Sequence, residues 1–166
     1  MKLPKRKSNR LNEYNYSKNG AYFVTICVKD RHELFWKQGV GATLGRPNDT
    51  AHLSIYGNVV NNEIKRIEKI YNDVVVITRY VIMPNHIHLV ICLQGNDGRP
   101  QVAPTISRVI QQFKGSVTKQ LGFPLWQKLF HDHIIRNEDE YFRILQYIEN
   151  NPFYWEQDLY YKPTNP

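Results

Sequence analysis

Apolar residues run together or alternate in four stretches that are typical of β-strands. AYFVTICV (21–28) is β-branched and aromatic throughout, so we expect a buried central strand. VVVIT (74–78) and YVIMPNHIHLVICL (80–93) predict two strands or one long bent strand, interrupted near Pro84, because proline cannot donate to a central ladder. LFHDHIIR (129–136) predicts a further strand.

Two segments between these strands have the period of amphipathic helices, and a third segment carries helix start and stop signals. Their apolar faces comprise Val60, Ile64, Ile67 and Tyr71 in the first segment and Ile106, Val109, Ile110, Phe113, Val117 and Leu121 in the second. The third helix is expected to begin after Asn137, an N-cap with Glu140 as its capping-box partner, and to end near Pro152. The aperiodic segments 38–50 and 94–104 are expected to be loops.

This order of strands and helices predicts an α+β fold. Helices that alternate with strands, including an antiparallel hairpin, favour a ferredoxin-like (RRM-like) sandwich, with a central antiparallel sheet and helices packed on one face. The 166 residues, 42% of them hydrophobic, suffice for one compact domain that spans residues 1–166. In it we distinguish a basic amino-terminal segment, 1–12, and a carboxy-terminal tail, 153–166.

The balance of charge favours a polyanionic partner. Lys and Arg number 22 against 15 Asp and Glu, which gives a formal net charge of +7, and nucleic acid is the first candidate. No apolar run follows the basic start as a secretory signal requires, and no stretch is long enough to span a bilayer, so we expect no membrane partner. Cys27 and Cys92 lie in apolar strands without metal-type spacing, which is typical of reduced core cysteines in a cytoplasmic protein.

Two histidines interrupt the most apolar strand. His86 and His88 are one residue apart, so in a strand both point to one face while Ile87 and Leu89 point to the other. Two imidazoles side by side are the start of a metal site, although a polar pair on a solvated sheet face has the same pattern.

The last predicted helix carries a candidate nucleophile. Tyr141, Ile144, Leu145 and Ile148 form its core stripe. Tyr147 flanks this stripe, and Asn151 lies within roughly 40 degrees of Tyr147 on the helical wheel. Tyr147 is either an amphipathic anchor with its hydroxyl in water or, if the helix packs over the histidines, a nucleophile beside an amide ligand.

These groups make chemical sense as a set. A tyrosine hydroxyl has a reference pKa near 10, so its attack on a phosphodiester at neutral pH needs help in losing the proton and in neutralising the phosphate. A divalent metal held by His86, His88 and Asn151 provides both, with Mn²⁺ favoured by the imidazoles and Mg²⁺ by abundance. No small-molecule organic cofactor is required.

Several blocks of the chain together resemble a known family. YVIMPNHIHLVI (80–91), followed by WQKLFHDHIIRNEDEYFRILQYIENNP (126–152), resembles the single-tyrosine HUH transposases and most closely the REP-associated tyrosine transposases. RLNEYNYSKNGAYFVTICVKDRHELF (10–35) fits the same group, so the resemblance extends from about Arg10 to Pro152. An isolated H-x-H is a weak signal, whereas these blocks in this order are specific.

The resemblance implies a function and roles for residues. The family's metal-binding histidines fall on His86 and His88, its nucleophile falls on Tyr147, and Asn151 matches a further polar ligand. The implied activity is the nicking of single-stranded DNA near a hairpin, with a 5′-phosphotyrosine link on the enzyme and a free 3′-hydroxyl. The bond energy is kept in that link, so rejoining needs no ATP. The tail lacks the continuation expected in several relatives.

Further residues are candidates for contacting DNA or lining the site. Candidate phosphate contacts are Arg136, Lys114 and the amino-terminal Lys5, Arg6, Lys7 and Arg10. Candidate base-stacking aromatics are Tyr14, Tyr16 and Trp126. His133 and Asn85 are possible site-lining residues, and His131 with His133 forms a second H-x-H.

Other functions fit the sequence less well. A histidine-triad hydrolase needs a third alternating histidine, where Val90 stands, and a two-histidine phosphoesterase needs an H-x-T or H-x-S pair in each half of the chain. A non-catalytic or domesticated nucleic-acid-binding protein with the same fold stays possible, but it would have no use for a histidine pair facing a tyrosine. Monomer and homodimer both stay open.

Overall fold

The computed structural model describes residues 20–38, 52–72, 74–94 and 104–163. Four strands form its sheet: β1 (Gly20–Cys27), β2 (Val75–Ile82), β3 (His86–Leu93) and β4 (His131–Ile135). The helices are α1 (Ile55–Tyr71), α2 (Ile106–Leu121) and α3 (Glu138–Asn150), and two 3-10 helices are η1 (Lys29–Arg31) and η3 (Asn151–Gln157). The loops expected at 38–50 and 94–104 fall almost entirely outside the described residues.

The strands form one antiparallel sheet in the order β2-β3-β1-β4. With α1 between β1 and β2 and α2 between β3 and β4, this is the ferredoxin-like arrangement, so the predicted fold class is confirmed. β1 pairs with both β3 and β4 and is central, as predicted. The chain between 74 and 93 forms two strands, because it reverses at Pro84 into a hairpin in which Ile82 pairs with Ile87.

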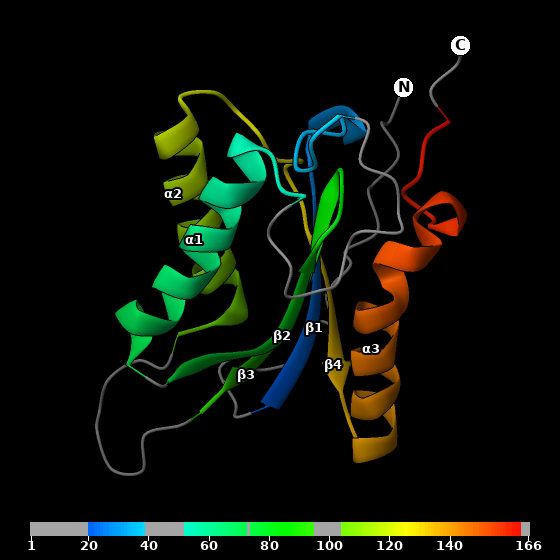
Figure 1. The fold of residues 1–166 in the computed structure, drawn as a ribbon. Helices are drawn as coiled ribbons and strands as arrows, with labels where there is room; N and C mark the ends of the chain where they lie inside the picture. Colours follow the sequence, from blue (N-terminus) through cyan, green and yellow to red (C-terminus); the bar gives the residue numbers. More distant parts are fainter. Residues whose placement is uncertain (1–19, 39–51, 73, 95–103, 164–166) are drawn as a thin grey trace, which may run out of the picture.

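The helices cover both faces of the sheet, which differs from the expectation of helices on one face. In Figure 1, α1 and α2 lie side by side on one face, and α3 lies against the other. The register explains how both faces are used. Val24 and Ile26 of β1 pair with Leu89 and Ile87 on the α1–α2 face, while Thr25 pairs with His88 on the α3 face.

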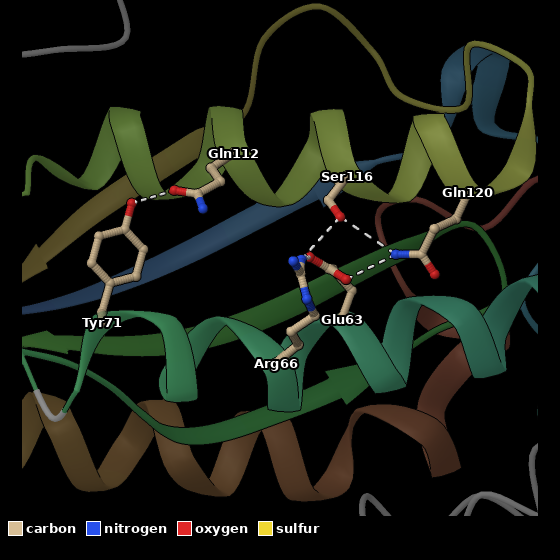
Figure 2. Close-up of polar contacts among 6 residues, drawn as sticks. All are labelled: Glu63, Arg66, Tyr71, Gln112, Ser116 and Gln120. Carbon is tan, nitrogen blue, oxygen red and sulfur yellow. Dashed lines mark hydrogen bonds and ion pairs between the residues drawn. The ribbon is translucent and has the colours of Figure 1, made fainter.

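A network of polar contacts joins α1 to α2 on their shared side (Figure 2). The carboxylate of Glu63 is only 1% exposed, and it accepts hydrogen bonds from Arg66 at 2.8 Å and from Gln120 at 2.9 Å. The hydroxyl of Tyr71 lies 2.6 Å from the amide oxygen of Gln112, which joins the same two helices further along. These bonds satisfy a carboxylate that would otherwise be costly to bury.

The start of α3 follows the predicted cap in part. The side chain of Asn137 accepts a hydrogen bond from the backbone N–H of Glu140, as an N-cap does. The carboxylate of Glu140 reaches the backbone N–H of Arg136 rather than that of Asn137, so the reciprocal bond of a capping box is shifted by one residue. It also accepts from Nε2 of His133, 2.7 Å away, which fixes α3 against β4.

Cys27 and Cys92 are both free thiols, and burial raises the pKa of Cys27 to about 11. Among the described helices, none has the length and apolar character needed to cross a membrane.

Candidate functional site

His86 and His88 lie side by side at the start of β3, on the sheet face that α3 covers. Both are buried, and the strand period directs both side chains to this face as predicted. Their Nε2 atoms are 3.0 Å apart, and their ring centroids are separated by 4.6 Å. The two nitrogens therefore converge on a single point in the site.

The other nitrogen of each imidazole is held by a neighbouring side chain. Nδ1 of His86 is 2.9 Å from the amide oxygen of Asn85, whose amide nitrogen donates to the carbonyls of Arg31 and Tyr160. These two bonds fix the orientation of the amide, so His86 must donate from Nδ1 and keep an unprotonated Nε2. Nδ1 of His88 forms a hydrogen bond with Oγ1 of Thr25 at 2.8 Å. Such partners orient the imidazoles that bind a metal.

Burial keeps both imidazoles neutral. It lowers the pKa of His88 to about 3 and, together with the nearby His88 and Arg31, holds the pKa of His86 well below its usual value. Neutral imidazole is the form that ligates a cation, so protons do not compete for these nitrogens near pH 7.

Tyr147 approaches the pair from α3. Its hydroxyl is 3.4 Å from Nε2 of His88, and its ring packs edge-on against Phe23, with ring centroids 6.0 Å apart. The residue is 44% exposed, so one side of the ring borders solvent. Burial of the remainder and the carboxylate of Asp158 raise the pKa of the Tyr147 hydroxyl to about 12, which makes the phenol a poor nucleophile unless positive charge is supplied.

Asn151 lies one helical turn after Tyr147, as the wheel predicts, and is buried. Its amide nitrogen donates to a carboxylate oxygen of Asp158 at 3.1 Å. Its amide oxygen is buried and has no hydrogen-bond partner among the described residues, which is unusual for a buried acceptor.

The carboxy-terminal tail supplies a residue that sequence reasoning missed. The ligand atoms of His86, His88 and Asp158 all lie within 4.8 Å of one another. Asp158 follows η3, and its second carboxylate oxygen accepts from the backbone N–H of Tyr160 at 2.7 Å. The Tyr160 ring centroid is in turn 4.6 Å from that of His86. The only sequence signal for this position was a carboxylate shortly after the last helix.

This donor set suits a divalent cation. The ligand atoms of two buried, neutral imidazoles and one partly buried carboxylate lie close together, and nitrogen and oxygen donors of this kind bind Mn²⁺ and Mg²⁺. Asn151, whose amide nitrogen bonds Asp158, adds an unpartnered amide oxygen next to this cluster.

The other predicted residues lie away from this cluster or outside the described residues. Lys5, Arg6, Lys7, Arg10, Tyr14 and Tyr16 belong to the part of the chain that the structure does not describe. Arg136 is exposed at the start of α3, at the end opposite to Tyr147. Lys114 donates to the backbone carbonyls of Gln127 and Lys128, so its ammonium group holds a loop.

Two further assignments change. Trp126 is buried, and its ring packs against Phe35 and Phe113, so the prediction that it stacks on DNA bases is wrong. His131 and His133 are exposed on β4, and among the described residues neither belongs to a three-ligand cluster. His133 pairs with Glu140 at 2.7 Å rather than with the site. Asn85 lies next to the histidines, where its amide oxygen is the partner of His86.

Comparison with known proteins gives two curated relatives and a solved structure. An uncharacterized protein of Haemophilus influenzae is 35% identical over 94% of this chain and 93% of its own length. A putative REP-associated tyrosine transposase of the same organism is 26% identical over 83% of this chain and 73% of its own length.

The solved structure of a REP-associated tyrosine transposase bound to a REP hairpin has the same fold. It aligns with a TM-score of 0.57 and 22% identity over 86% of this chain and 73% of that chain. None of the protein-family models searched matches the chain.

Proposed function

Because the chain belongs to the family of the REP-associated tyrosine transposases, we propose that it is a metal-dependent endonuclease and strand transferase that nicks single-stranded DNA beside a hairpin. The observation that carries this proposal is the convergence of the Tyr147 hydroxyl on the buried His86–His88 pair. A nucleic-acid-binding module of the same fold has no use for such an arrangement. The partner, hairpin DNA, is inferred from the REP hairpin named for the structural neighbour.

The reaction follows from the position of Tyr147. Its Oη attacks the scissile phosphorus, so an Oη–P bond forms and the P–O3′ bond breaks. The 3′ oxygen leaves and takes up a proton, while the phenolic proton passes to water on the exposed side of the ring. The DNA 5′ phosphate is then linked to Tyr147, and attack by a 3′-hydroxyl on that link reverses the step without ATP.

The chain's own residues prepare this attack. The ring of Tyr147 packs against the rings of Phe23 and His88. These contacts hold the phenol beside the imidazoles and limit its rotation before the reaction. Thr25 and Asn85 fix the two imidazoles, so neither ring must reorient when a ligand arrives.

A divalent cation fits the same place. His86, His88, Asp158 and Asn151 would hold Mn²⁺ or Mg²⁺, and the bound cation would supply positive charge to the tyrosinate and the phosphate.

The test is covalent capture of DNA. Purified protein is incubated with labelled hairpin oligonucleotides drawn from the DNA around its own gene, in Mn²⁺ or in EDTA, and adducts are resolved on a denaturing gel. We expect a metal-dependent adduct in wild type that is absent in Tyr147→Phe. Tyr154→Phe removes an exposed hydroxyl from the neighbouring η3 and is the matched control, which should form the adduct as wild type does.

Two results would count against the proposal. Retarded DNA without an adduct, in any metal and with a randomised hairpin pool as well, would identify a binding protein. An adduct that persists in Tyr147→Phe would place the nucleophile elsewhere.

A further inference from the structure

The turn that follows β1 holds two consecutive residues in the left-handed region. Asp30 and Arg31 both have a φ of 58°, although neither is glycine. Each such residue costs free energy, and strained residues of this kind gather at functional sites, where the surrounding structure holds them in place.

This turn is tied to the histidine site by backbone contacts. The carbonyl of Arg31 accepts a hydrogen bond from the amide nitrogen of Asn85, the residue whose oxygen orients His86. The backbone N–H of Val28 donates to the carbonyl of Asn85, and that of Arg31 donates to the carbonyl of Val28. The strained backbone is thus held at a fixed distance from the imidazoles.

The side chain of Arg31 is a cation beside the site that has no anionic partner among the residues that the structure describes. Its guanidinium carbon is 5.1 Å from the ring centroid of Tyr160, the ring that lies against His86. Its one hydrogen bond to a described residue is a long one of 3.5 Å to the carbonyl of Leu159. Among the described residues, no carboxylate lies within ion-pair distance of Arg31. Its charge is close enough to contribute to the lowered pKa of His86.

We propose that Arg31 binds a phosphate of the substrate strand next to the phosphodiester that Tyr147 attacks. The inference rests on the proposed function, because it takes single-stranded DNA as the ligand. A guanidinium matches two phosphate oxygens in one plane, and a weak contact to a carbonyl is easily exchanged for that bidentate contact. Lys162, which donates to the carbonyl of Asp30, adds a second positive charge at the same end of the sheet.

A purely structural role for Arg31 makes a different prediction. If Arg31 only anchors the tail through Tyr160 and Leu159, its loss would weaken binding to every oligonucleotide alike. If Arg31 binds one phosphate, neutralising that phosphate should weaken binding by the wild-type side chain but not by a variant that lacks Arg31. Neutralising any other phosphate should affect both proteins equally. The test must therefore combine protein variants with changes in single phosphates.

The experiment measures affinity for hairpin oligonucleotides that carry one uncharged methylphosphonate linkage, moved along the single-stranded flank. Tyr147→Phe is the background, so that no cleavage occurs, and Arg31→Gln is compared with Arg108→Gln. Arg108 is an exposed arginine on α2, on the opposite face of the sheet, so it loses the same charge far from the site.

In the background and in Arg108→Gln, we expect one or two adjacent methylphosphonates near the cleaved linkage to weaken binding about tenfold. In Arg31→Gln, those same linkages should have no further effect. If Arg31→Gln keeps the sensitivity at every linkage, the proposal is wrong. If Arg31→Gln does not fold by thermal unfolding, Arg31→Asn replaces it, because asparagine tolerates a positive φ.

These outcomes are separable from those of the proposed function. A wild-type protein that binds the hairpin without forming an adduct refutes the nuclease, while the methylphosphonate comparison still decides the role of Arg31. A protein that binds none of the oligonucleotides refutes both.

Discussion

Burial of the two imidazoles links the stability of the protein to pH. In the folded protein the pKa of His88 is about 3, whereas in the unfolded chain it is near 6.5. Below pH 6.5 the unfolded chain therefore binds a proton that the folded protein does not, so stability is complete above about pH 6.5 and is lost as the pH falls.

We expect the free energy of unfolding to fall by about 2 kcal/mol between pH 7 and pH 5 from His88 alone. Urea titrations in EDTA at several pH values measure this slope. His88→Gln should have a shallower slope, and equal slopes in the two proteins would contradict the neutral, buried state of His88.

Asp158 is the residue-scale feature that decides how a cation is held. It is the one carboxylate in the cluster, so its loss removes the only negative charge among the donors. We expect Asp158→Asn to lower Mn²⁺ affinity by about tenfold or more, measured by titration calorimetry of the DNA-free protein. Glu156→Gln, an exposed acid of the same tail, is the matched control and should bind Mn²⁺ as wild type does. Equal affinity in all three proteins would remove Asp158 from the ligand set.

Residue patterns could predict only the part of the site that lies on regular elements. His86 and His88 were predicted to share a sheet face because the side chains of a strand alternate with a period of two. Tyr147 and Asn151 were predicted to be neighbours because residues four apart lie on the same side of a helix. Asp158 could not be predicted in this way. It follows a 3-10 helix, where no sequence period indicates which way a side chain points, and its position at the site is held by bonds to Asn151 and Tyr160.

At the scale of the elements, α1 and α2 each contain a glycine, and the two differ in whether the structure has room for a larger side chain. Gly115 lies inside α2, and an added Cβ would meet no atom of the described residues within 4 Å beyond its own helical surroundings. Gly57 lies in the first turn of α1, where an added Cβ would be 2.3 Å from the carbonyl oxygen of Phe35.

Gly115→Ala should stabilise the protein by about 0.5–1 kcal/mol, because alanine loses less backbone entropy than glycine in a helix. Gly57→Ala should destabilise it by about 1–3 kcal/mol, since backbone must move to make room. Denaturant unfolding of both variants measures the difference, and a stabilised Gly57→Ala would contradict the packing of α1 against the segment that contains Phe35.

The sheet face that α3 covers could not be predicted from the spacing of its apolar residues. Its stripe of Tyr141, Ile144, Leu145 and Ile148 packs on the core, as its spacing predicts. The stripe does not specify the sheet face on which α3 packs, because both faces of the sheet carry apolar residues. One face is covered by α1 and α2, and α3 covers the other. Val90 and Phe23 face α3, and only the register reveals this.

In the whole molecule, the site forms where three separate parts of the chain meet. β3 brings the histidines, α3 and its C-cap bring Tyr147 and Asn151, and the tail brings Asp158 and Tyr160. The turn after β1 adds Arg31 from a fourth direction. The strand order that places β1 beside β3 was predictable from the order of elements, whereas the return of the tail to the histidines depends on contacts far apart in sequence.

The central claim is that Tyr147 becomes covalently linked to DNA, and peptide mapping tests it most directly. Wild-type protein is incubated with a hairpin oligonucleotide and Mn²⁺, digested with trypsin and nuclease, and examined by mass spectrometry. The tryptic peptide that contains Tyr147 also contains Tyr154, Tyr160 and Tyr161, and we predict that its fragmentation places the nucleotide phosphate on Tyr147 alone. A nucleotide on a different residue, or none while the DNA is cleaved, would contradict this account.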